Sequence, residues 1–200
     1  MGAILAIERD GIVYMATDAS KSLNETRVCV SAESNLKIHK LPSGILCAAI
    51  GPSHVAQRLY LHDEWFILAE GETFDKRFLV ERIVPKFYEE IKDMDVWDTD
   101  KVIKRNKTTF LFAKGSKLFI MQEDLSVSKC DGVAAISSNV ANELMFAYAA
   151  YCKESDPIAV LRSAFALATR SMCNVSADSY YVIDTKELEF HKMEVVECSL

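Results

Sequence analysis

The chain has 200 residues, 50% of them hydrophobic, and a formal net charge of −6 at pH 7. This length and apolar content predict a single globular domain over residues 1–200, while the acidic balance and the lack of a basic stripe argue against a nucleic acid as partner. No apolar run approaches the ~20 residues of a membrane-spanning helix, and no signal-peptide pattern opens the chain, so we expect a cytoplasmic protein without a membrane partner.

Two short apolar runs at the start of the chain predict a β-hairpin. Residues 3–7 and 12–16 flank the turn dipeptide Asp10-Gly11, and the second run leads directly into Asp18. The hairpin therefore brings a carboxylate back beside the start of the chain. An α-amino group has a pKa of about 7.7–8.0 and can act as a general base for an adjacent nucleophile, but Gly2 offers no nucleophilic side chain.

Blocks of strands and helices alternate after the hairpin. Runs rich in apolar residues predict strands, and apolar residues at helical spacing behind the capping residues Ser53 and Asp75 predict helices. The strands are expected at residues 27–30, 36–39, 45–50, 108–113, 117–122, 132–136, 179–184 and 188–195, and the helices at residues 53–68, 75–91, 139–152 and 156–170. Pro85 either kinks the second helix or marks the start of a shorter one.

The order of these elements predicts the fold class. It runs strands, two helices, strands, two helices, strands, and several strands are apolar on both faces, as expected when both faces of a sheet are covered. This order predicts an α+β fold, a four-layer αββα sandwich. Two antiparallel sheets would pack face to face, with a helix pair outside each of them.

Several motifs resemble the proteasome β-subunit family and its HslV-type relatives, which are N-terminal-nucleophile hydrolases. The element order is similar over nearly the whole chain, and the motif match is concentrated in the first sixty residues or so. The matching segments are residues 3–7, the turn at Gly11, residues 16–18 (Ala-Thr-Asp), residues 37–41 (Lys-Ile-His-Lys-Leu) and residues 49–51 (Ala-Ile-Gly) ahead of a helix. The resemblance implies the αββα fold of that superfamily.

The resemblance also implies roles for four residues. In the family an N-terminal threonine hydroxyl attacks a peptide carbonyl while its own amino group carries the proton. Asp18 and Lys37 match the aspartate and lysine that adjust the local pKa values. Gly51 matches the glycine whose N–H stabilises the oxyanion, and Ser138 matches the serine that hydrogen-bonds the terminal amine. Each residue also has a structural alternative. Asp18 would be a turn carboxylate and Lys37 a solvated strand lysine, while Gly51 would form a strand-to-helix turn and Ser138 a helix N-cap.

The chain departs from the family pattern at the position that matters most for catalysis. Counting back from Asp18 along the hairpin places Gly2 where the threonine stands, so the nucleophile is missing. A later family site, an aspartate followed three residues on by a serine, falls on Ser171 and Asn174. The connection from Asp18 to Lys37 is also a few residues longer than usual. The resemblance thus implies a threonine-peptidase lineage with impaired catalysis.

Other chemically capable residues have structural interpretations. Thr17, Ser20 and Cys47 could each be a displaced nucleophile, although such residues are more often structural. His39 has no partners in the sequence pattern, and the acidic residues around Trp97 lack the spacing of a calcium loop, so no metal or cofactor is expected. The six cysteines form no Cys-x-x-Cys pair and favour free core thiols.

Three functions remain open from the sequence. The chain is an active hydrolase with altered chemistry, a non-catalytic structural or regulatory subunit of a ring, or a small-molecule binding protein that uses the cleft around Lys37 and Gly51. The resemblance implies a homo-oligomeric ring with heterologous interfaces, an ATPase as partner, and a peptide or protein substrate for an active form.

Overall fold

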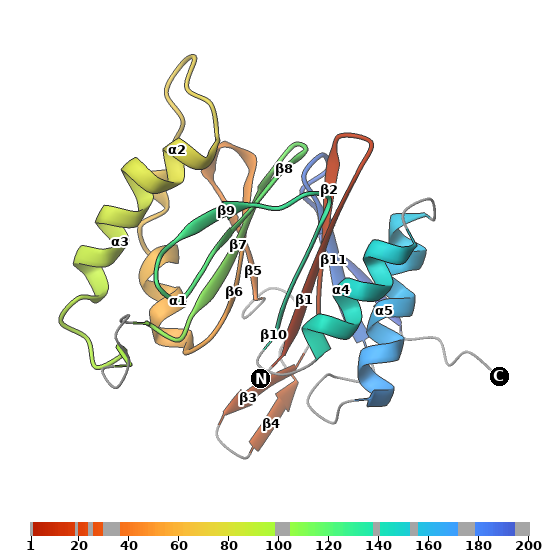
Figure 1. Cartoon of the computed structure of the whole chain (residues 1–200). Coiled ribbons are helices and arrows are strands. Elements are labelled where there is room, and N and C mark those ends of the chain that lie inside the picture. The colour runs from red at the N-terminus through yellow and green to blue at the C-terminus, as the bar shows by residue number, and fades with distance from the viewer. Residues whose placement is uncertain are drawn as a thin grey trace.

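The computed structural model of the protein describes residues 2–18, 20–23, 26–29, 37–98, 105–137, 141–152, 156–171 and 179–194. Figure 1 shows two sheets side by side, with α1 and α3 outside one sheet and α4 and α5 outside the other. The α+β class and the four-layer αββα arrangement predicted from the element order are confirmed.

The first sheet has five antiparallel strands in the order β10-β1-β2-β11-β12. They are β1 (Ala3–Arg9), β2 (Ile12–Asp18), β10 (Val133–Ser137), β11 (Ser179–Asp184) and β12 (His191–Glu194). The opening hairpin is therefore the centre of a sheet, which explains why its residues are apolar on both faces.

The predicted turn of the hairpin has the geometry that its strands require. Asp10 and Gly11 have φ angles of 51° and 82°, the two positive values of a type I′ turn. This turn matches the right-handed twist of the flanking strands and pairs Arg9 with Ile12. The register then runs back along the hairpin to the pair Ile4 and Thr17.

The second sheet has five antiparallel strands in the order β5-β6-β7-β8-β9. They are β5 (Ile38–Leu41), β6 (Ile45–Ile50), β7 (Thr109–Lys114), β8 (Lys117–Met121) and β9 (Val127–Lys129). The 3-10 turn η1 (Pro42–Gly44) joins β5 to β6. The sequence pattern missed β9 because this strand is only three residues long.

A separate two-stranded sheet follows the first hairpin. It pairs β3 (Ser20–Leu23) with β4 (Thr26–Cys29). The expected strand at residues 27–30 overlaps β4, whereas β3 was not expected.

The first predicted helix is shorter than expected. The segment 53–68 forms α1 (Ser53–Tyr60) and then the 3-10 turn η2 (Asp63–Phe66). Val55 and Leu59 face the core, but the next positions on that face of a continued helix are the polar residues at 62 and 63. The helix therefore stops, and the tighter turn brings Phe66 back into the core.

The second predicted helix is continuous but changes its winding ahead of Pro85. It consists of α2 (Lys76–Phe78), the π-helical turn η3 (Leu79–Ile83) and α3 (Val84–Ile91). A proline in the first turn of α3 has no N–H to donate, and a wider π turn ahead of it accommodates the lost bond. The predicted cap is confirmed, because Asp75 Oδ1 accepts the Phe78 N–H at 2.8 Å.

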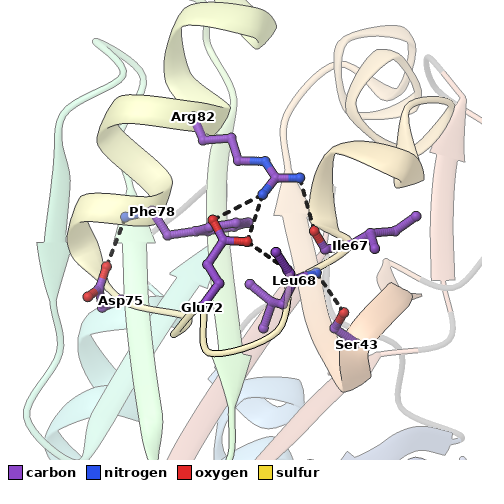
Figure 2. A network of polar contacts seen from close by, with 8 residues as sticks. Ser43, Ile67, Leu68, Glu72, Asp75, Phe78 and Arg82 are labelled. Carbon is purple, nitrogen blue, oxygen red and sulfur yellow. Dashed lines mark hydrogen bonds and ion pairs between the residues drawn. The ribbon is translucent and has the colours of Figure 1, made fainter.

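Figure 2 shows the hydrogen bonds that hold the loop before this helix. The guanidinium of Arg82, in η3, donates to both carboxylate oxygens of Glu72 and to the Ile67 carbonyl. Ser43 Oγ accepts the N–H of Leu68 at 3.0 Å. These bonds tie the segment between η2 and α2 to both the helix and the β5–β6 turn.

The remaining helices are α4 (Ala141–Tyr151) and α5 (Pro157–Ser171), close to the predicted segments 139–152 and 156–170. Three apolar clusters separate the four layers. One lies between α1, α3 and the second sheet, one between the two sheets, and one between the first sheet and α4 and α5. In the parts of the chain that the structure describes, no helix is long and apolar enough to cross a membrane.

Candidate functional site

Asp18 lies beside the start of the chain, as the hairpin predicted. The register of β1 and β2 places the end of β2 next to Ala3, whose N–H donates to Asp18 Oδ1 at 2.8 Å. The Asp18 side chain is fully buried. A carboxylate in this position is stable only when charged or donor groups compensate the loss of water.

Lys37 supplies that compensation from the other sheet. Its residue immediately precedes β5, and its Nζ donates to Asp18 Oδ1 at 2.5 Å and to the Asp18 carbonyl at 3.2 Å. The Lys37 side chain is 17% exposed and that of Asp18 is 0% exposed. This ion pair links the two sheets at the amino end of β1 and brings together the two residues that match the family aspartate and lysine.

The same lysine fills the space beside Gly2. Gly2 is buried, and a Cβ atom at this position would overlap Lys37 Nζ. That Cβ would also lie 2.5 Å from Lys37 Cε and 2.6 Å from Asp18 Oδ1. The volume that a side chain at position 2 would occupy therefore holds an ammonium group that is already bound to Asp18.

Gly51 lies at the carboxyl end of β6, with a φ of 150°. A Cβ here would come within 2.5 Å of the Lys107 carbonyl oxygen and 2.6 Å of Thr108 Oγ1. The approaching segment is held by Asn106, whose Oδ1 accepts the Thr108 N–H at 2.8 Å. Close backbone contact by itself requires glycine at position 51, so the oxyanion role of its N–H stays a prediction.

The structure tests the remaining family matches only in part. Ser138 and Asn174 lie outside the described residues, and Ser171 is the last residue of α5. Ser137 ends β10 directly opposite Ala3, beside the start of the chain.

The three residues considered as displaced nucleophiles lie in surroundings typical of structural residues. Thr17 is buried, and its hydroxyl donates to the Ala3 carbonyl at 3.3 Å. Cys47 is buried in the core between the second sheet and its helices, and burial raises the pKa of its thiol well above the usual value. Ser20 begins β3, a strand outside both large sheets.

His39 stacks on the ring of Tyr60, with centroids 4.6 Å apart, and burial lowers its pKa. No group of three His, Cys, Asp or Glu side chains within the described segments could hold a metal ion. The described cysteines Cys47, Cys130 and Cys152 are free thiols, as their spacing predicted.

The groups that the structure assembles around position 2 are the buried Asp18 carboxylate, the Lys37 ammonium, the Ala3 N–H and the Asp18 carbonyl. Such a set can hold charge and orient an amine next to it. Peptide cleavage by an N-terminal side-chain nucleophile also needs a hydroxyl or thiol, and position 2 carries neither.

Comparison with known proteins gives matches in structure alone. No protein-family model and no curated protein matches the sequence. The structure is similar to that of Thiobacillus denitrificans BPH, with a TM-score of 0.67 and 18% identity over 98% of this chain and 99% of that chain. It is also similar to BPH in complex with epoxomicin, with a TM-score of 0.66 and 18% identity over 97% of this chain and 99% of that one.

A third similar structure is the eukaryotic HslV from Trypanosoma brucei. The TM-score is 0.63 and the identity 17%, over 91% of this chain and 98% of that chain. These likenesses establish that the chain has the fold of proteasome-type and HslV-type proteins. The resemblance predicted from the sequence is confirmed at the level of the fold.

Proposed function

We propose that this chain is a proteasome-type, HslV-like subunit of the N-terminal-nucleophile hydrolase lineage in which peptide hydrolysis is impaired. The observation that carries the proposal is the buried pair of Lys37 and Asp18 beside Gly2. The pair has the composition that the resemblance implies for a peptidase site, and it adjoins the position that the resemblance gives to the nucleophile. The fold likeness to HslV over 91% of the chain supports the same assignment.

The impairment has two causes that act together. Glycine provides no atom that could attack a carbonyl, and the space for such an atom is taken by Lys37 Nζ. In an active site of this kind the ammonium stands beside the nucleophile rather than in its volume. A nucleophile at position 2 therefore requires the end of the Lys37 side chain to move.

The test is peptide hydrolysis by the native protein, Gly2→Thr and Gly2→Val, measured with fluorogenic peptides of several sequences. Intact mass spectrometry records whether Met1 has been removed from each preparation. Threonine and valine have nearly the same shape, so their difference isolates the hydroxyl. We expect no hydrolysis by the native protein or by Gly2→Val, and measurable hydrolysis by Gly2→Thr.

Two results would contradict this proposal. Hydrolysis by the native protein that equals that of Gly2→Thr would overturn the impairment. Inactivity of a folded Gly2→Thr variant lacking Met1 would show that the remaining site no longer supports catalysis, which favours a purely structural subunit.

A structural or regulatory ring subunit is the second candidate. The observation that favours it is the exposure of large apolar side chains on α4, where Phe146 is 46% and Tyr151 is 89% exposed. Closed rings use heterologous interfaces, in which such a face is covered by a different surface of the next copy. Light scattering at micromolar concentration should then give a mass several times that of the 22.4 kDa chain, and a monomer would contradict ring assembly.

A further inference from the structure

Three side chains that have no part in the proposed function lie close together beside the main chain of Lys37. They are His39 in β5, Cys47 in β6 and Tyr60 at the end of α1. The register of the second sheet places His39 opposite Cys47, and Tyr60 reaches both of them from the helix layer. The group lies between the sheet and α1, on the main-chain side of Lys37.

Tyr60 makes two contacts here. Its hydroxyl donates to the Lys37 carbonyl at 3.4 Å, and its ring stacks on His39 at an interplanar angle of 13°. Burial raises the pKa of Tyr60 well above its usual value, so the hydroxyl keeps its proton at neutral pH.

The Lys37 carbonyl accepts the single hydrogen that the tyrosine hydroxyl can donate. The Lys37 carbonyl also accepts the Ala49 N–H at 3.1 Å, so two donors from two elements hold this peptide group.

The position of that peptide group decides where the ammonium can go. A lysine side chain is a flexible four-carbon stem, and its head group is placed only as well as its backbone is. Lys37 immediately precedes β5, and the Ala49 N–H of the neighbouring strand holds its carbonyl. The bond from Tyr60 acts at the point where the main chain leaves the sheet.

We propose that Tyr60 is a positioning residue for Lys37: it fixes the start of β5 so that Nζ reaches Asp18 and fills the space beside Gly2. His39 stacks on the tyrosine ring and holds it in place. The inference rests on the proposed function only in treating the Lys37 and Asp18 pair as the functional site.

The test is the rate at which each lysine of the intact protein is acetylated by a trace of acetic anhydride, read by peptide mass spectrometry. In Tyr60→Phe the ring and its stacking remain, and only the hydroxyl is lost. We expect acetylation of Lys37 to rise roughly two- to tenfold, the population change that corresponds to one neutral hydrogen bond. Asp18→Asn, which removes the charge that Nζ contacts, is the positive control.

Internal controls separate positioning from general loosening. Lys114 and Lys117 belong to the same sheet, and each donates to a backbone carbonyl, of Ser43 and Phe74 respectively. A purely structural role of Tyr60 would raise acetylation of all three lysines together. Tyr88→Phe, which removes a hydroxyl from the exposed face of α3, should leave Lys37 unchanged.

An unchanged rate at Lys37 in a folded Tyr60→Phe variant would overturn the proposal, as would a parallel rise at all three lysines. If Tyr60→Phe fails to fold, His39→Leu removes the stacking and should raise acetylation of Lys37 alone. The readout does not depend on peptide hydrolysis, so a native protein found to be an active peptidase would refute the proposed impairment without affecting this result.

Discussion

The two glycines of the candidate site lack side chains for different physical reasons. At Gly2, the amino end of β1, the space for a Cβ is filled by the far end of a lysine side chain. At Gly51, the carboxyl end of β6, the space is filled by the main chain at Lys107 and Thr108, and φ is positive. The first neighbour can move and the second cannot.

This difference separates a functional loss from a structural requirement. Gly51 is explained by the packing of the fold, whatever its N–H does. Nothing comparable requires glycine at position 2, because the atoms that oppose a side chain there belong to the side chains of Lys37 and Asp18 and not to the main chain. Substitutions at the two ends of the site should therefore differ in size, and four predictions test that expectation from the largest effect to the smallest.

The largest effect is expected for Asp18→Asn at the amino end. The carboxylate is buried, accepts the Ala3 N–H and contacts an ammonium that is only 17% exposed. Loss of one charge of a buried pair costs roughly 3–5 kcal/mol, and we expect a decrease of this size in the free energy of unfolding, measured with urea.

A second substitution checks the cause of that loss. In Asp18→Asn/Lys37→Met both charges are gone, and part of the lost stability should return, because no buried ammonium is then left without its carboxylate. A decrease below about 1 kcal/mol for Asp18→Asn would mean that the pair is solvated like a surface ion pair.

Gly51→Ala is expected to cost roughly 2–4 kcal/mol. The new Cβ meets a carbonyl oxygen and a Cα that belong to the main chain, and the positive φ adds strain. Urea unfolding measures the effect. The matched control is Gly115→Ala, where φ is 56° but nothing lies within 4 Å, so only the conformational cost of about 1–2 kcal/mol applies. Equal losses in the two variants would contradict a steric requirement at position 51.

The comparison of the two glycines also shows which features of the site could be predicted from the sequence. The hairpin at the amino end could be predicted because the turn dipeptide and the two apolar runs are neighbours in the chain. The predicted proximity of Asp18 to position 2 follows from that local pairing. The overlap of Lys37 with position 2 and the contact of Gly51 with the segment 107–108 depend on how distant strands pair, which no local pattern encodes.

Element ends were the other source of error. The helix expected over residues 53–68 stops at Tyr60, because its apolar face is interrupted by polar residues while Phe66 still reaches the core through a 3-10 turn. That early end matters for the site, since it leaves Tyr60 beside Lys37. The periodicity of the apolar residues predicted the helix but not the residue at which it ends.

The third prediction concerns the segment that opposes Gly51. In Asn106→Ala the Thr108 N–H loses its acceptor in a place where both residues are fully buried. An unsatisfied buried donor costs roughly 1–3 kcal/mol of unfolding free energy. Thr108→Val removes only a hydroxyl whose hydrogen bond is 3.4 Å long, and should cost less than about 1 kcal/mol by the same measurement. The reverse order would mean that the hydroxyl, and not the amide oxygen, holds this segment.

Gly2→Ala should have the smallest effect, a change of less than about 1 kcal/mol in the free energy of unfolding. The added methyl group displaces the end of Lys37, which can turn toward its exposed side while still contacting Asp18. The acetylation rate of Lys37 should rise even though stability hardly changes, because its ammonium becomes more accessible. A loss as large as that of Asp18→Asn would show that Lys37 is held as rigidly as the main chain at Gly51. Restoring a nucleophile at position 2 would then require a second substitution at Lys37.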